Sequence, residues 1–217
     1  CLRSDEMRIS FMGSNPFPPR RRQACTCIMV ELGDGHRFFF DFGSGCLRNI
    51  IAMRVPIEAI NDIFITHLHV DHFGDLPYLY TFAPHNGRYT PLRVTGPSGS
   101  APEFGTKAMI AGMKQMTAWN IDSINIMPVG DGAEIEVNEF DWADDNGLCY
   151  DADGIQIRHW RRSHTKDGAS AYRLDWAGLS FVWTGDGRPD ERTIDFSQGA
   201  DLFVDRKSTR LNSSHRT

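Results

Sequence analysis

Alternating and continuous apolar runs divide the chain into short strands and helices. Strand patterns occur at Met7–Ser14 and in residues 24–32 and 36–45, the latter two joined by a Gly-Asp-Gly connection typical of a hairpin. Further strands are predicted at 62–65 and Pro91–Pro97, within 125–162 and 169–187, and at 200–205. Helical spacing appears at 46–53, after Gly74, and at Pro102–Trp119, whose methionines are predicted to be packing residues. Strands with interspersed helices, without internal repeats or low-complexity linkers, predict an α/β (α+β) fold in one domain.

Composition indicates a globular protein with a real hydrophobic core. Of 217 residues, 41% are apolar and 24% are charged, and no run approaches the roughly 18 to 20 apolar residues of a membrane span. Five cysteines form neither a CxxC pair nor a regular disulfide spacing, so we expect reduced, mostly buried thiols. The chain begins without Met and without a signal-peptide pattern. Localisation stays open: the cytoplasm is slightly favoured, and an exported form is the alternative.

The last thirteen residues, 205–217, differ in composition from all that precedes them. Asp205–His215 resembles the translation of a common sequencing-library adapter, so we expect residues 7–204 to form the domain and 205–217 to be a non-native tail. Residues 1–204 carry 19 Lys+Arg and 27 Asp+Glu, a net charge of −8. An acidic body is a poor general match to a polyanion such as nucleic acid, although local basic clusters could still bind an anionic group.

The stretch "THLHVDHFGD", residues 66–75, carries the strongest chemical signal. His67 and His69 lie two residues apart at a predicted strand end, so their side chains can project the same way, while Asp71 and His72 follow where the backbone turns. Imidazoles and carboxylates are ligands that zinc, iron(II) and manganese accept. Ligands that divide two and two suit a dinuclear site with metals about 3.5 to 4 Å apart.

These residues resemble the metallo-β-lactamase superfamily, and the resemblance extends over nearly all of 7–204. It begins at "FMGSNPFPPRR", continues through "FFFDFGSG" and reaches "WTGDGRP" and "GADLFVD". It implies an αββα sandwich with metals at one edge between two sheets, here missing its last strand and helix portion. The opening loop and the "DFGSG" strand end look most like the ribonuclease Z and arylsulfatase-type branch.

The resemblance implies a ligand set of six residues. His67, His69 and His164 would hold one metal, Asp71 and His72 the second, and Asp186 in "TGDG" would bridge the two. His164 is preferred to His159, which alternates with Ile155 and Ile157 on one strand face and is expected in the core or behind the ligands. The family's further histidine after "DLFVD" is missing, because His215 lies in the suspected tail. The second site would therefore be weak or distorted.

The implied cofactors are two divalent metal ions, with zinc preferred and manganese or iron(II) as alternatives. Asp71 is also the candidate catalytic residue, orienting water or moving a proton. Asp41 and Thr66 are candidates for fixing the ligand histidines, with ordinary strand-end hydrogen bonding as the alternative.

Substrate residues are less well defined. Arg161, Arg162 and Lys166 surround His164, and Arg20 begins a basic triplet on a loop; either group could clamp an anion or be a solvated face. Four features count against a ribonuclease Z: Val70, the altered helix start after it, the acidic body and the lack of a visible basic arm. We therefore expect a hydrolase of a small, anionic ester (phosphodiester, sulfate ester or lactone), with tRNA 3′ processing as the first alternative and an inactive metal-binding fragment or non-catalytic relative as the second. A small-molecule substrate is favoured over nucleic acid, and a homodimer is left open.

Overall fold

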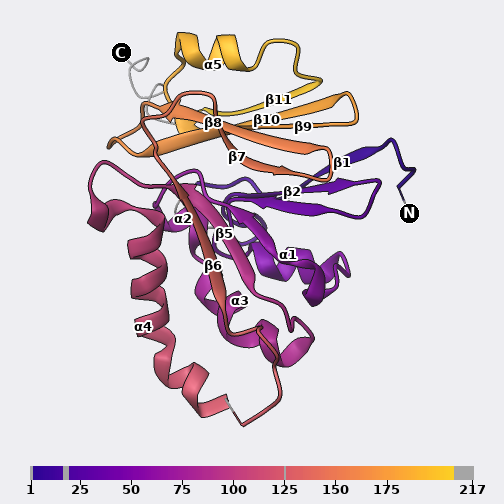
Figure 1. Cartoon of the computed structure of the whole chain (residues 1–217), viewed down its shortest axis with the longest axis vertical. Helices are drawn as coiled ribbons and strands as arrows, with labels where there is room; N and C mark the ends of the chain where they lie inside the picture. The colour runs from indigo at the N-terminus through magenta and orange to yellow at the C-terminus, as the bar shows by residue number, and fades with distance from the viewer. Residues whose placement is uncertain (1, 17–19, 125, 208–217) are drawn as a thin grey trace.

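Two β-sheets packed face to face form the centre of the molecule (Figure 1). The computed structural model describes residues 2–16, 20–124 and 126–207. The first sheet has the order β1 (Met7–Gly13), β2 (Cys27–Leu32), β3 (Arg37–Phe40), β4 (Asp62–Phe64), β5 (Leu92–Pro97), β6 (Ile135–Phe140). The second has the order β11 (Leu202–Lys207), β10 (Leu179–Gly187), β9 (Ala169–Trp176), β8 (Ile155–Arg162), β7 (Gly147–Ala152).

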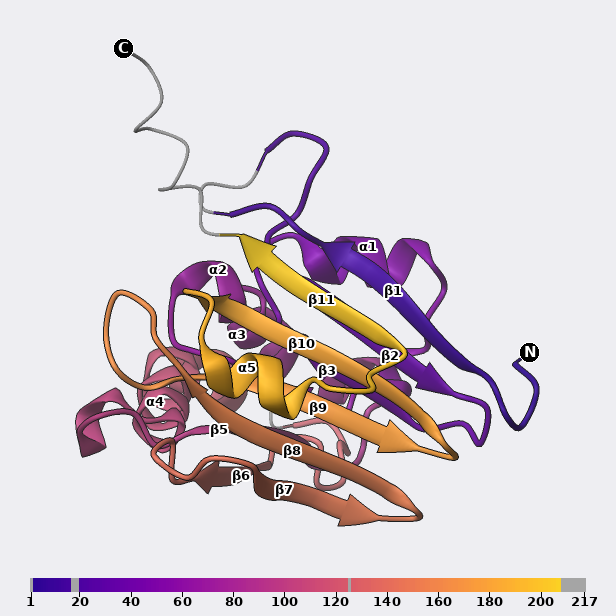
Figure 2. The ribbon, with the colours of Figure 1, turned by 90° about the horizontal axis from the view of Figure 1, so that it is seen from above.

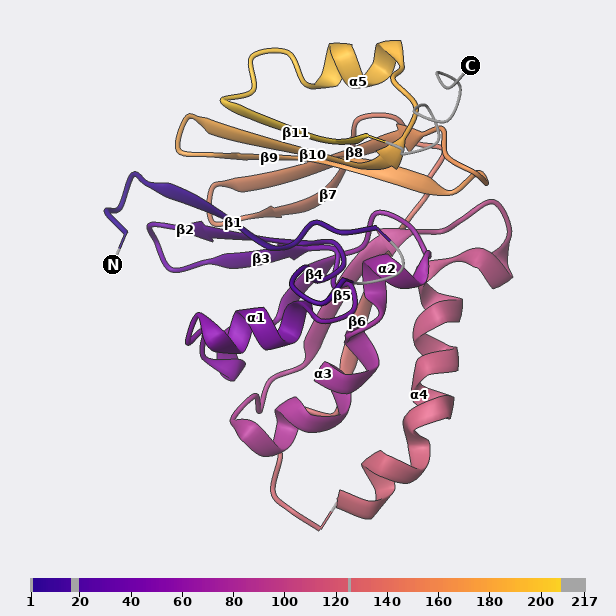
Figure 3. The same cartoon turned by 180° about the vertical axis from the view of Figure 1, so that it is seen from behind.

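Helices cover the outer faces of both sheets. The first sheet is covered by helices that connect its strands, and the second by a single short helix, as Figures 1 and 3 show from opposite sides. The helices are α1 (Cys46–Ala52), α2 (Val70–Phe73), α3 (Leu76–Phe82), α4 (Thr106–Ile124) and α5 (Glu191–Phe196), with 3-10 turns η1 (Ile57–Ala59), η2 (Ala83–Asn86) and η3 (Pro102–Phe104). This arrangement confirms the predicted αββα sandwich. None of the described helices is both long and apolar enough to cross a membrane.

Strand direction changes within each sheet. β1, β2 and β3 form an antiparallel meander, which includes the predicted hairpin, whereas β3 to β6 run parallel through helical crossovers. The second sheet is antiparallel except for β11, which pairs parallel with β10 (Figure 2). Both sheets are therefore mixed, and the parallel strands bring several carboxyl ends to one edge.

Strands buried on both faces explain the continuous apolar runs of the sequence. Every residue of β2 is buried. Ile28 and Val30 face the second sheet, while Cys27 and Met29 face the helices. Phe40 lies between the sheets in the same way, and alternation of side chains sends its neighbour Phe39 to the opposite core. A strand covered on both sides loses the polar alternation of a surface strand.

Several packing predictions can be checked against the structure. His159 is buried, and its ring stacks on Phe140 with centroids 3.6 Å apart, as expected of a core residue. The described cysteines (Cys25, Cys27, Cys46 and Cys149) are free and buried, as predicted. On α4, Met113 is buried, but Met116 is 69% exposed, so its predicted packing role is wrong. Met116 lies away from the helix face that buries Ile110 and Met113. Residues 208–217, most of the suspected tail, lie outside the described residues.

Candidate metal centre

Three segments that are far apart in the sequence meet at one edge of the sandwich. The HxHxDH stretch leaves the end of β4 and continues into α2, while His164 follows β8 and Asp186 lies near the end of β10. Gly185, immediately before Asp186, has a positive φ of 59°, and a Cβ there would lie 2.8 Å from Cβ of Thr66. A glycine is therefore required for β10 to approach the motif closely.

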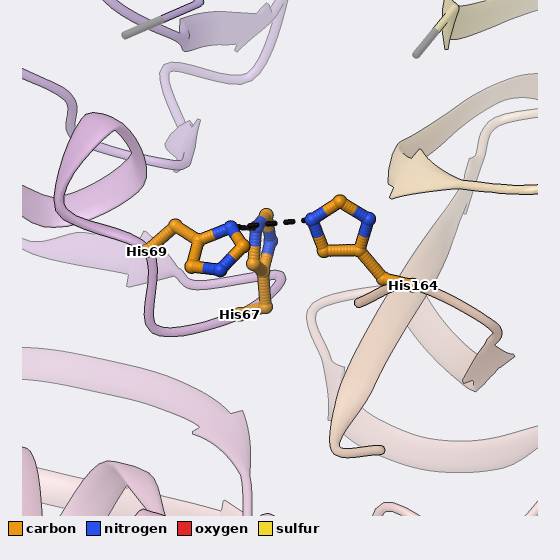
Figure 4. A group of neighbouring side chains, drawn as sticks. All are labelled: His67, His69 and His164. Carbon is orange, nitrogen blue, oxygen red and sulfur yellow. Dashed lines mark hydrogen bonds between the residues drawn. The ribbon is translucent and has the colours of Figure 1, made fainter. Parts of the chain in front are cut away.

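The first cluster consists of three imidazole rings (Figure 4). Nε2 of His67 lies 3.0 Å from Nδ1 of His69, and Nε2 of His164 lies 3.2 Å from that same Nδ1. All three potential ligand atoms lie within 4.8 Å of one another. Nitrogens that converge in this way, from rings held by separate elements, form a suitable donor set for one divalent ion.

The second cluster shares His67 and adds His72 and Asp186. Nε2 of His72 lies 3.6 Å from Oδ2 of Asp71 and 3.7 Å from Oδ1 of Asp186. The other carboxylate oxygen of Asp186, Oδ2, lies 3.9 Å from Nε2 of His164, so this side chain stands between the two clusters. Its Oδ1 atom is buried and receives no hydrogen bond from the described residues. A buried carboxylate oxygen that accepts no hydrogen bond fits a metal ligand, and its nearest charged group is Nη1 of Arg206 at 3.1 Å.

Asp41 holds the ligand histidines from behind. Its Oδ2 atom accepts hydrogen bonds from Nδ1 of His72 at 2.8 Å and from Nε1 of Trp183 at 2.9 Å. Its Oδ1 atom accepts from the Thr66 backbone N–H at 2.8 Å, and the Thr66 hydroxyl lies 3.1 Å from Nδ1 of His67. Because these contacts occupy the Nδ1 atoms of His67 and His72, both Nε2 atoms are left to face the site. Asp41 and Thr66 thus contact the ligand histidines, and their positioning role stays a prediction.

Burial and neighbouring charges set the protonation of the site. Burial lowers the pKa of His67 well below its usual value, and the nearby rings of His72, His164 and His69 lower it further. The pKa of His164 is also lowered, by burial, although Asp186 opposes this. Burial disfavours the charged form of His72 as well, but Asp41 and Asp186 outweigh it and raise its pKa to about 9. His67 and His164 are therefore neutral at pH 7, with a lone pair available.

Arg206 enters the second cluster from β11. Its Nη2 donates to Oδ2 of Asp71 at 2.9 Å, its Nη1 lies 3.1 Å from Oδ1 of Asp186, and Nη1 also contacts Nε2 of His72. The guanidinium and the His72 ring thus share the carboxylates of Asp71 and Asp186.

The predicted substrate-binding residues divide into two groups. Arg161 forms a double hydrogen bond with Asp145, and Arg162 is buried and donates to Asp190, so both serve the packing of the second sheet. Lys166 lies on the connection that carries His164, with its Nζ 3.8 Å from the ring centroid of Phe104, and Arg20 is exposed. Lys166 and Arg20 remain candidates for contact with an anionic substrate.

Sequence reasoning missed two residues of the site. Trp183 looked like an ordinary core residue of a strand, and its face could be predicted from alternation with Phe181, but its hydrogen bond to Asp41 could not. Arg206 lies in the segment expected to be a non-native tail, and that expectation stays untested. Alternation along a strand would put it on the same face as Val204.

Comparison with known proteins agrees with this geometry. Residues 20–144 match the metallo-beta-lactamase superfamily, a stretch that contains the whole HxHxDH motif. This chain belongs to that superfamily. Among solved structures, human tRNase Z, short form, has a TM-score of 0.70 over 90% of this chain and 76% of that one, at 18% identity. Zn(2+)-bound PqqB from Methylobacterium extorquens has a TM-score of 0.60 over 91% of this chain and 72% of that one, at 13% identity. At these identities the structural likeness concerns the fold.

Curated relatives that this superfamily member matches include ribonucleases Z. A ribonuclease Z of Methanococcus maripaludis is 40% identical over 92 residues, which cover 42% of this chain and only 30% of that protein. A ribonuclease Z of Mycobacterium avium is 26% identical over 208 residues, covering 91% of this chain and 69% of that protein. The chain thus has the metallo-β-lactamase fold and candidate His/Asp metal sites, as predicted. These relatives favour the alternative prediction, tRNA processing, over the small-molecule hydrolase first expected.

Proposed function

We propose that the protein is a metal-dependent phosphodiesterase of the ribonuclease Z type, which cleaves precursor tRNA near its 3′ end. The observation that carries the proposal is the pair of adjacent clusters that share His67, with Asp186 between them. Such a pair suits hydrolysis of a phosphodiester, in which the attacking and leaving oxygens both need stabilisation. The ribonuclease Z relatives support RNA as the substrate.

The residues of the chain would divide the work as follows. His67, His69 and His164 would hold the first ion, and Asp71, His72 and Asp186 the second. When bound, divalent cations supply Lewis acidity that makes water a stronger acid and withdraws charge from a phosphoryl oxygen. Asp71, which is buried beside the clusters, would accept or pass on the proton of the attacking water. Asp41 and Thr66 would keep the two Nε2 atoms aimed at the site.

The surface near the site offers few free positive charges for a long polyanion. Lys166 and the exposed Arg20 to Arg22 loop end are candidates for contact with phosphates. Together with the acidic composition, this favours hydrolysis of a small phosphodiester as the second candidate function.

A paired assay separates the two functions. The chain would be incubated with manganese or zinc and either a precursor tRNA carrying a 3′ trailer or bis(p-nitrophenyl) phosphate. We expect endonucleolytic release of the trailer, with loss of at least a hundredfold in rate in His67→Ala and little change in the exposed control Arg192→Ala. Hydrolysis of the small diester alone would favour the second function. Absence of His67-dependent hydrolysis of both substrates would refute a phosphodiesterase.

A further inference from the structure

Two connections between strands lie side by side next to the first cluster. One joins β8 to β9 and carries His164, and the other follows β5 and contains η3. A Cβ added to Gly168 would lie 3.0 Å from Cα of Gly99, and one added to Gly99 would lie 2.4 Å from the backbone oxygen of Phe104. Both glycines have a positive φ, 114° for Gly168 and 70° for Gly99. This close packing holds Phe104 in place relative to the connection that carries His164.

The Lys166 ammonium meets the Phe104 ring across these two connections. Its Nζ atom lies 3.8 Å from the ring centroid, within the range of a cation–π contact. The ring is 44% exposed, and Lys166 is exposed as well. Within the described part of the chain the ammonium forms no ion pair, although Glu103 and Asp167 lie next to these residues in the sequence. Its charge is therefore available to an anion, at a place that the ring defines.

The connection passes the first cluster immediately before it reaches Lys166. The ring of His164 points toward His67 and His69 (Figure 4). The hydroxyl of Thr165, the next residue, lies 3.4 Å from Nε2 of His69. Two residues span at most about 7 Å, so the backbone of Lys166 lies close to that of His164. The charge of Lys166 is thus beside the candidate metal ligands without belonging to them.

We propose that Lys166 binds the phosphate next to the one that is cleaved, and that the Phe104 ring positions the ammonium for this contact. Such a contact rests on the proposed function, because it requires a substrate with successive phosphates, one of them at the clusters. Hydrogen bonds from an ammonium to a phosphate are strong, and contacts of this kind fix the register of a nucleic acid on a protein. A lysine already held over a ring gives up less conformational freedom on binding than a free one does. Lys166 therefore favours a polynucleotide over a diester with a single phosphate.

Nucleotide binding tests the role of Lys166 without turnover. Zinc-loaded protein would be titrated into a fluorescein-labelled trinucleotide of deoxythymidine, followed by fluorescence anisotropy, and thymidine 5′-monophosphate would compete as the probe with one phosphate. Lys166→Ala should weaken binding of the trinucleotide about tenfold and reduce the slope of log Kd against log salt concentration by about one. Its affinity for the monophosphate should change less than about twofold. The control Lys114→Ala, which removes a lysine farther along α4, should leave both affinities unchanged.

Variants of Phe104 separate positioning of the ammonium from direct contact with the nucleotide. Phe104→Leu should weaken binding of the trinucleotide about threefold, whereas Phe104→Tyr keeps an aromatic face and should bind within about twofold of the unaltered chain. In the Lys166→Ala background, Phe104→Leu should cause no further loss, because the ring acts through the ammonium. An equal loss in both backgrounds would show that the ring contacts the nucleotide itself and would overturn the positioning role.

The phosphate subsite would be wrong if the unaltered chain did not bind the trinucleotide, or if Lys166→Ala bound it equally tightly. Circular dichroism checks that each variant folds, and Lys166→Gln, which also removes the charge, is held to the same criterion. Binding that depends on Lys166, without cleavage of precursor tRNA, would refute the proposed function and support the subsite. Cleavage of precursor tRNA with a KM that Lys166→Ala leaves unchanged would refute the subsite and support the proposed function.

Discussion

Replacing Asp41 by Asn tests the network behind the metal ligands most directly. Asp41 is fully buried, and its two carboxylate oxygens accept from Thr66, His72 and Trp183. Its backbone has a positive φ of 61°, a conformation that Asn also tolerates, so the exchange adds little backbone strain. The substitution therefore changes one acceptor oxygen into an NH₂ donor and leaves shape almost unchanged.

The loss in free energy of unfolding follows from counting the buried hydrogen-bond donors that lose their acceptor. The Asn oxygen can replace either Oδ2, which serves His72 and Trp183, or Oδ1, which serves Thr66, but not both. At least one buried donor then faces an NH₂ group, at a cost of about 1 to 3 kcal/mol, and the charge-assisted character of the remaining bonds is lost. We expect the free energy of unfolding to fall by about 3 kcal/mol. Loss of orientation of the His72 ring should weaken zinc binding about 10- to 100-fold.

Two measurements check these values. Urea denaturation of the metal-free protein, followed by tryptophan fluorescence, gives the free energy of unfolding, and competition with a chromogenic chelator gives zinc affinity. Asp151→Asn makes the same chemical change at an exposed position of β7 and should change stability by less than about 0.5 kcal/mol. If Asp41→Asn matched Asp151→Asn in both stability and zinc affinity, the positioning role assigned to Asp41 would be wrong.

Three further predictions concern stability. Phe40→Ala should lower the free energy of unfolding by about 3 to 5 kcal/mol in urea, because Phe40 is fully buried against Phe64 and Phe181; a loss under 1 kcal/mol would contradict this packing. Burial lowers the pKa of His159 from its usual 6.5 to about 4, so its contribution to stability is complete above pH 6.5 and is lost as the pH falls toward 4. Between pH 7 and pH 5, the free energy of unfolding measured by urea titration should therefore fall about 2 kcal/mol less in His159→Gln than in the unaltered chain. Equal decreases would contradict the lowered pKa of His159. Zinc at about 100 times its Kd should stabilise the metal-free protein by about 2.7 kcal/mol, seen as a rise of several degrees in Tm that His164→Ala abolishes; an equal rise in that variant would place the ion elsewhere.

The local sequence determined most of the elements and the HxHxDH half of the site. Spacing alone puts His67, His69, Asp71 and His72 at a strand end and the turn after it, because these residues are too close in the chain to separate. Continuous apolar runs such as β2 could likewise be recognised as buried strands. The reason is that hydrophobic periodicity depends only on residues that are close together in the sequence.

Tertiary structure alone decided which distant residues join that half-site. The convergence of His164 and Asp186 on the motif depends on how the two sheets pack, and the sequence pointed to these residues only through family resemblance. Arg161, Arg162 and Lys166 looked equivalent in the sequence, yet two are held in ion pairs and the third lies over a ring. Arg206 reaches the metal ligands only because β11 pairs with β10 in one register. The order of charges along the chain does not show which groups they will meet in space, and those partners decide whether an arginine binds substrate or stabilises a sheet.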